Sequence, residues 1–254
     1  MPAADGAADG IANYIRRRQI DFLDFGCSHG ASLDYARATF GGHRGLGVDL
    51  SPQKVENARA AGHDAVVADV TALQLGDNSV DFVTMIHFLE HLPSFDAALR
   101  AIGSAIRVAR DFVYIRHPWF DSDAHLLELG YKFYWSDWAG HSLHFDRLAF
   151  VRALNRLKHT GRWTLMGRNL IRDTTDPSVI PLLAPVDSFG VDPDEARQRE
   201  PVAIQPRAFR EVACLIQSGE IARFNEARSS LDSRHAILLE FDGMRRLASM
   251  TASE

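Results

Sequence analysis

Residues 20–30 read Ile-Asp-Phe-Leu-Asp-Phe-Gly-Cys-Ser-His-Gly. The apolar run suits a central strand of a parallel sheet that is covered by helices on both faces. Gly26 and Gly30 lack a Cβ, so the backbone can turn tightly here and its N–H groups can approach a ligand closely. The stretch therefore predicts a strand, a glycine turn with a nucleotide-like ligand, and a helix over 31–40. Alone, the pattern also fits NAD-binding proteins and ordinary tight turns.

Acidic residues follow the next two predicted strands. The strand at 45–48 ends at Asp49 and Leu50, and Ser51-Pro52 then opens a helix with an N-cap and a proline at its first position. A carboxylate at such a strand end can accept both hydroxyls of a ribose. The strand at 65–68 ends at Asp69 and Val70, and a turn over 75–81 leads into a fourth strand at 82–86.

The fourth strand is followed by the sequence His-Phe-Leu-Glu-His-Leu at 87–92. The ordered series from residue 20 to this point resembles the class I S-adenosylmethionine-dependent methyltransferases, and most closely their type 11 group of small-molecule enzymes. The resemblance covers residues 20–118 most fully. It implies a Rossmann-like α/β fold: a three-layer αβα sandwich around a mostly parallel sheet with an antiparallel hairpin at its edge.

The resemblance also implies roles for individual residues around S-adenosylmethionine. Asp24, Gly26, Cys27, Ser28 and Gly30 fall in or beside the loop around the amino-acid part of the cofactor. Asp49, next to Leu50, corresponds to the residue that accepts the ribose hydroxyls. Asp69 and Val70 correspond to the adenine site, and Ile86 and His87 to the methionine end. Ser28 departs from the family, which more often has glycine at this position, and a side chain there narrows the allowed backbone angles.

NAD binding is the alternative for this half of the chain. It calls for Gly-x-Gly-x-x-Gly after the first strand, whereas this chain has Gly26-x-x-x-Gly30. Asp49 suits either cofactor. Asp69 and the turn at 77–81 favour the methyltransferase.

Length and composition suit a globular enzyme of one domain. The net charge is −5 over 254 residues, which provides no basic surface for nucleic acid. Cys27 and Cys214 lie far apart in the sequence and suggest a reducing cytoplasm. No apolar run is long enough to span a membrane, and residues 1–10 resemble a tail rather than a signal peptide. The oligomeric state stays open.

We expect one domain over 1–254, comprising a terminal tail or helix (1–18), a cofactor-binding half (19–118), an aromatic segment (119–145) and a C-terminal part (146–254). The C-terminal part contains a helix capped by Asp146, two late strands at 162–171 and 208–217, and a proline-rich segment between them at 172–207. Residues 236–241 fit either a strand or a helix. The aromatic segment leaves the sheet at the end where ligands bind, so we expect it to be a lid over the methyl acceptor.

Methyl transfer is an in-line displacement in which the protein mainly aligns the reactants. An oxygen acceptor must also lose a proton, and a histidine is a suitable base. The candidates are His91, His141 and His144, with His87 as a further one. His141 and His144 share a face if their segment is helical. Each of these histidines also has a purely structural interpretation.

A metal site is a further possibility, because Glu90 and His91 have His87, His141 or His144 as possible neighbours. Some methyltransferases of this fold hold a divalent ion with glutamates and histidines. Their pattern has a glutamate where this chain has His87, so we expect no metal. The overall prediction is methyl transfer to an oxygen or nitrogen atom of a small molecule. The alternative is a protein that binds the cofactor as a sensor or scaffold without turnover.

Overall fold

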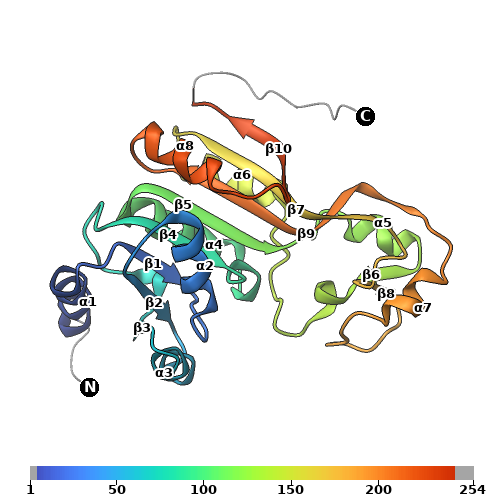
Figure 1. Ribbon diagram of the computed structural model, residues 1–254, viewed down its shortest axis with the longest axis horizontal. Helices are drawn as coiled ribbons and strands as arrows, with labels where there is room; N and C mark the ends of the chain where they lie inside the picture. The colour runs from blue at the N-terminus through green and yellow to red at the C-terminus, as the bar shows by residue number, and fades with distance from the viewer. Residues whose placement is uncertain (1–4, 244–254) are drawn as a thin grey trace.

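A computed structural model describes residues 5–243 and contains one eight-stranded sheet (Figure 1). Strands β1 to β5 pair in parallel in the order β5-β4-β1-β2-β3, as predicted. These strands are β1 (Phe22–Phe25), β2 (Gly45–Asp49), β3 (Asp64–Val67), β4 (Val80–Ile86) and β5 (Ala109–Pro118).

Three antiparallel strands complete the sheet beside β5. In order they are β9 (Ala203–Gln217), β7 (Trp163–Asp173) and β10 (His235–Phe241). The antiparallel edge is therefore confirmed, but it is one strand wider than the predicted hairpin. Residues 236–241, for which the sequence allowed either a strand or a helix, form part of strand β10.

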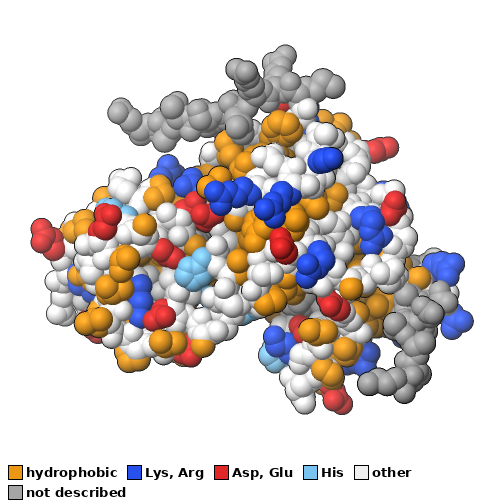
Figure 2. Space-filling model, turned by 180° about the vertical axis from the view of Figure 1, so that it is seen from behind, with side chains coloured by type: hydrophobic (Ala, Val, Ile, Leu, Met, Phe, Trp, Pro, Cys, Tyr) orange, Lys and Arg blue, Asp and Glu red, His pale blue; other side chains and the backbone are white. Residues whose placement is uncertain are grey.

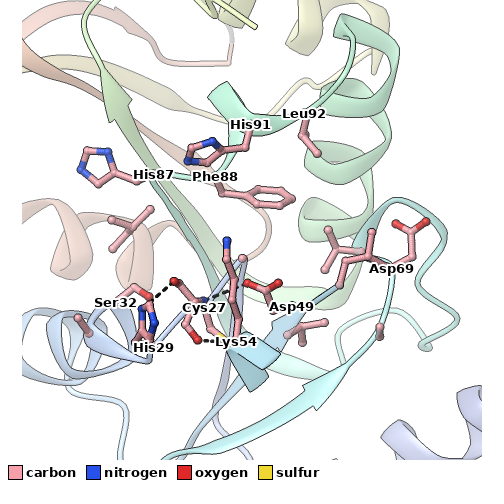
Figure 3. A pocket seen from close by; sticks show the side chains of 18 of the residues that line it. Cys27, His29, Ser32, Asp49, Lys54, Asp69, His87, Phe88, His91 and Leu92 are labelled. Carbon is pink, nitrogen blue, oxygen red and sulfur yellow. Dashed lines mark hydrogen bonds between the residues drawn. The ribbon is translucent and has the colours of Figure 1, made fainter. Parts of the chain in front are cut away.

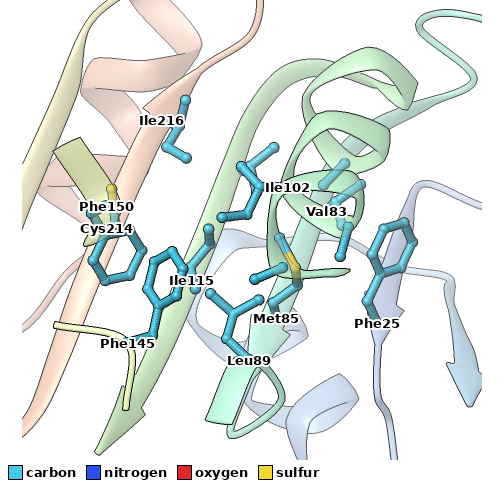
Figure 4. Close-up of a cluster of buried hydrophobic side chains, with 14 of the residues drawn as sticks. Phe25, Val83, Met85, Leu89, Ile102, Ile115, Phe145, Phe150, Cys214 and Ile216 are labelled. Carbon is cyan, nitrogen blue, oxygen red and sulfur yellow. The ribbon is translucent and has the colours of Figure 1, made fainter. Parts of the chain in front are cut away.

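Helices cover both faces of the sheet, which makes the predicted three-layer sandwich. One face carries apolar side chains of α1 (Asp5–Arg18), α4 (Phe95–Val108) and α6 (Arg147–Arg156). Figure 4 shows part of this layer, with Ile102 of α4 and Phe150 of α6 facing the strands. The other face carries side chains of α2 (Ala31–Phe40), α3 (Pro52–Ala60) and α8 (Ile221–Ser229). Residues 5–10, predicted as a tail, belong to helix α1, whereas residues 1–4 lie outside the described range.

Side-chain caps fix several helix starts where the sequence indicates them. The hydroxyl of Ser51 accepts the N–H of Lys54 at the start of α3, and Pro52 occupies the first helical position. The carboxylate of Asp146 accepts the N–H of Ala149 at 2.7 Å at the start of α6. None of the helices within residues 5–243 has both the length and the apolar composition needed to cross a lipid bilayer.

A second lobe lies beside the sheet in Figure 1 and is built from the aromatic segment and the proline-rich segment. It contains α5 (Asp123–Glu128), β6 (Tyr131–Phe133), β8 (Val179–Pro181) and α7 (Pro193–Arg197). β6 and β8 pair with each other as a small antiparallel sheet. Trp119, Phe133 and Phe145 are fully buried, so much of the aromatic segment forms packed core rather than an open flap.

In Figure 2 the molecule is seen from behind, and charged side chains of both signs are interspersed over this face.

A stack of phenylalanine rings crosses the sheet on the α2 side. Phe82 of β4 lies parallel to Phe22 of β1 and Phe112 of β5, with centroid separations of 4.7 and 4.9 Å. Phe40, the last residue of α2, meets Phe82 and Phe112 edge-on. Offset and edge-to-face ring pairs stabilise a core beyond the area they bury. The stack joins the three strands in their amino-terminal parts.

We expect Phe82→Ala to lower the free energy of unfolding by about 3–5 kcal/mol, because it leaves a cavity between two buried rings. Urea denaturation measures this change. Leu183→Ala is the control, since its side chain is 94% exposed, and we expect a change below about 0.5 kcal/mol. Equal effects of the two substitutions would contradict the role of the stack.

Candidate active site

The first cavity opens at the carboxyl ends of the parallel strands and has a volume of about 620 Å³ (Figure 3). Ligands of open α/β sheets bind at this edge. The structure brings most of the predicted cofactor residues to its wall: Gly26, Cys27, Ser28, Asp49, Leu50, Asp69, Val70, Ile86 and His87. Asp24 and Gly30 are not part of the wall.

The loop after β1 has the backbone shape that its glycines allow. Gly26 has φ 75° and Gly30 has φ 96°, both in the left-handed region. A Cβ on Gly26 would collide with the ring of Phe88, and one on Gly30 would collide with the imidazole of His63. Ser28 also has a positive φ, 48°. Ser28 therefore adopts the left-handed backbone conformation that glycine favours, although it has a side chain.

Asp49 joins this loop to the end of β2. Its Oδ2 accepts the N–H of Ser28 at 3.1 Å, and its Oδ1 accepts the N–H of Ser51 at 2.9 Å. The residue is 8% exposed and borders the cavity. Each carboxylate oxygen has a second lone pair, so Asp49 can hold the two loops and still accept hydrogen bonds from a ligand.

Asp24 lies behind the loop and is fully buried. The hydroxyl of Thr84 on β4 donates to Oδ1 at 2.7 Å, and the hydroxyl of Ser32 in the first turn of α2 donates to Oδ2. Burial raises the pKa of Asp24 to about 7, although both hydrogen bonds act to lower it. The carboxyl group therefore connects strand, loop and helix, and it titrates near neutral pH.

Asp69 caps the 3₁₀ turn Val70–Ala72 at the end of β3. Its Oδ1 accepts both the N–H and the hydroxyl of Thr71 at 2.8 Å. In Figure 3 Asp69 lies at the side of the cavity opposite His87. The two predicted ends of the cofactor site, adenine and methionine, thus fall on opposite sides of one cavity.

Several wall residues were not predicted, among them Tyr35, Lys54 and Arg116. The guanidinium of Arg116 lies 4.4 Å from the ring centroid of Tyr35, and its Nε is 3.1 Å from Glu211. Arg116 could have been noticed in the sequence, because it is a charged residue within the buried strand β5 and such residues are seldom buried without a partner. The sequence around Tyr35 and Lys54 has no comparable feature that would have predicted their place in the wall.

His87 directly follows β4, has φ 51° and lies between two carboxylates. Its Nε2 is 2.8 Å from Glu211 and its Nδ1 is 3.3 Å from Glu90. Desolvation lowers the pKa of His87, but hydrogen bonds and charge from Glu211 and Glu90 outweigh it and raise the pKa to about 9. His87 is therefore cationic at neutral pH, which argues against its candidacy as a general base.

A second cavity of about 390 Å³ adjoins the first, and His87 and His91 border both. Its other walls come from the turn after β4, from β5, β7 and β9, and from the aromatic segment: Glu90, Pro118, Tyr134, Trp135, Trp138, His141, Asn169, Arg210 and Glu211. The aromatic segment thus contributes rings to a cavity beside the first one.

Of the two histidines predicted in the aromatic segment, only His141 lines this cavity. His144 stacks on Phe120 at 4.3 Å and forms an ion pair with Asp123 at 3.2 Å. The shared helix face proposed for His141 and His144 is wrong, because residues 138–146 are not helical. Trp138 packs against His141, and His144 borders neither cavity.

Residues 23–110 match the family model described as a methyltransferase domain. The fold is similar to the crystal structure of a SAM-dependent methyltransferase from Archaeoglobus fulgidus, with 18% identity, a TM-score of 0.53, and coverage of 83% of this chain and 94% of that one. It is also similar to a putative methyltransferase from Bacillus halodurans C-125, with 14% identity, a TM-score of 0.52, and coverage of 83% and 99%. No curated protein matches the sequence.

The matched residues contain the glycine loop, Asp49, Asp69 and the end of β4. The chain therefore has the fold of the SAM-dependent methyltransferases, and its residues 23–110 match a methyltransferase domain, which supports the predicted likeness to the class I, type 11 group. It is an enzyme whose cofactor is S-adenosylmethionine.

The buried Asp24 makes stability depend on pH. A carboxyl group whose pKa is higher in the folded state stabilises the fold below its unfolded pKa of 3.8, and this contribution is lost as the pH rises through about 7. The difference between these pKa values corresponds to at most about 4 kcal/mol. Asparagine resembles the protonated, uncharged carboxyl group. We therefore expect Asp24→Asn to remove the loss of stability that occurs as the pH rises.

Urea denaturation at about pH 4 and about pH 8 tests this expectation. The variant should gain stability relative to the wild type as the pH rises. Parallel stability curves for the two proteins would show that Asp24 does not titrate in this range.

Proposed function

We propose that the enzyme transfers the methyl group of S-adenosylmethionine to an oxygen or nitrogen atom of a small molecule held in the second cavity. The observation that carries this proposal is the junction of the two cavities at His87 and His91. A volume of about 390 Å³, walled by aromatic rings and a few polar groups, suits a small organic acceptor.

The first cavity fits the cofactor on three features of this chain. The turn at Gly26 brings backbone close to the cavity, Asp49 offers carboxylate oxygens at a strand end, and Asp69 lies on the side opposite His87. We assign the amino-acid part to the loop around Gly26, Cys27 and Ser28, supported from behind by Asp24 and Gly30. Asp49 and Leu50 then border the ribose, Asp69 and Val70 the adenine, and Ile86 and His87 the methionine end.

S-adenosylmethionine supplies, when bound, a methyl group activated by a sulfonium. The protein then has to hold the acceptor in line with that group and exclude water. Tyr134, Trp135 and Trp138 provide the aromatic walls for an acceptor. Cationic His87 provides a fixed positive charge at the junction, held in place by Glu211 and Glu90.

His141 and His91 remain the candidates for proton transfer, and His144 is no longer one because it borders neither cavity. Burial lowers the pKa of His141, although its hydrogen bond to Trp135 opposes the shift. A neutral imidazole can accept a proton from an acceptor hydroxyl or ammonium group. The cytoplasm stays the proposed compartment, because Cys27 and Cys214 are both free thiols.

Asp49→Asn should weaken binding of S-adenosylhomocysteine about ten- to a hundredfold. The substitution removes the charge from an acceptor of two ligand hydroxyls, and hydrogen bonds to charged groups contribute about 1.5–3 kcal/mol. Isothermal titration calorimetry provides the affinity. Asp64→Asn is the matched control, since this carboxylate lies at the opposite end of the sheet, bonded to the hydroxyl of Tyr14. Unchanged affinity in Asp49→Asn would remove Asp49 from the site.

Methyl-labelled cofactor tests the acceptor class directly. Incubated with the enzyme and a cell extract, it should label a small molecule in an enzyme-dependent way. With that acceptor, Trp138→Ala should raise KM about tenfold or more while leaving the affinity for S-adenosylhomocysteine unchanged, because the ring would contact the acceptor only. Label found only in protein or nucleic acid would refute the proposal. Cofactor binding without any labelled product would favour a sensor or scaffold.

A further inference from the structure

Three side chains at the edge of the second cavity bring potential metal ligands together. One donor atom each from Glu90, His91 and His141 lies within 4.8 Å of the others. Glu90 and His91 belong to the 3₁₀ turn after β4, and His141 belongs to the aromatic segment. The imidazole rings of His91 and His141 have centroids 5.1 Å apart.

Each of these two histidines is held in its orientation by a hydrogen bond from its Nδ1 atom. Nδ1 of His91 is 2.8 Å from the carbonyl oxygen of Gly140, and Nδ1 of His141 is 2.7 Å from that of Trp135. A carbonyl oxygen only accepts, so each Nδ1 must carry the hydrogen. The lone pair of each neutral ring is then on Nε2. Metal-binding histidines have this arrangement, in which the second nitrogen donates to a carbonyl or carboxylate.

Glu90 has fewer partners than a buried carboxylate requires. It is fully buried, and within residues 5–243 its one ion pair is with His87, while neither oxygen has a hydrogen bond of regular geometry. The charge nearest to it is His87, whose Nδ1 is 3.3 Å from Oε1. Buried polar atoms are almost always bonded, and exceptions call for an explanation such as a missing ion. A cation held between Glu90 and the two Nε2 atoms would satisfy this carboxylate.

We propose that Glu90, His91 and His141 form a binding site for a divalent transition-metal ion. Two imidazole nitrogens and one carboxylate oxygen suit ions such as zinc, cobalt, manganese or iron(II). Magnesium and calcium prefer oxygen ligands alone, so they are disfavoured. Three protein ligands leave coordination positions for water or substrate, as in catalytic rather than structural sites.

The position of the site gives the metal a role, which rests on the proposed function. All three side chains line the second cavity, where we propose that the acceptor binds, and His91 also borders the first cavity. With the Nε2 atoms of His91 and His141 on the metal, neither ring could accept a proton. The metal would take over that role, because a metal ion lowers the pKa of an oxygen bound to it. An acceptor hydroxyl on the metal would therefore lose its proton at neutral pH, and it would be held at the junction with the methyl donor site.

Cobalt(II) is a suitable probe, because its visible absorption reports coordination by protein nitrogen. Tag-free protein treated with a chelator should bind one cobalt ion per chain in a saturable titration. Glu90→Gln and His91→Gln should each weaken the affinity at least tenfold, and His141→Gln should do the same. His144→Gln is the matched control, because it lies in the same segment and should bind cobalt as the wild type does.

Affinity for S-adenosylhomocysteine, measured on the same preparations, shows whether each variant is folded. Absence of saturable binding of cobalt, zinc and manganese by the wild type would overturn the proposal. So would cobalt affinity that stays unchanged in folded Glu90→Gln and His91→Gln. The metal titration needs no acceptor, so its failure is distinct from a failure to find labelled product in the methyl-transfer assay.

Discussion

The carboxylate of Asp49 is the interaction on which the site depends. It accepts one N–H from the loop after β1 and one from the loop after β2, so two separate turns are fixed relative to each other. Asp24 provides the corresponding link one layer deeper, from β1 to β4 and to α2. Because parallel strands end at the same edge, two short carboxylates are enough to hold two loops, a neighbouring strand and a helix around the cavity.

Local signals made the parallel half of the sheet predictable. The apolar strands, the glycines at the first turn and the caps at Ser51 and Asp146 each act over a few residues, and the structure has them where expected. Most of the residues predicted for the cofactor site line the first cavity, since the end of a strand defines the edge of the sheet. Arg116 was missed because its position depends on Glu211, which is distant in sequence.

The second lobe was less predictable, since its structure depends on contacts between distant segments. β6 pairs with β8, and spacing within either segment does not reveal this pairing. The spacing of His141 and His144 would give a shared face only on a helix, and the backbone between them is not helical. β10 was ambiguous for a different reason: a short apolar run has no decisive period.

The second lobe, in which β6 pairs with β8, is formed by parts of the chain that lie apart from most residues of the first cavity. This separation affects how such an enzyme can diversify. The walls of the first cavity come almost entirely from residues 26–93, whereas the rings and Asn169 and Arg210 of the second come from later parts of the chain. Mutations in the lobe can therefore alter the shape of one compartment without disturbing the strands and loops of the other. Under the proposed function, substrate range and donor recognition can then change separately within one polypeptide, and the two compartments meet only at the two histidines that border both.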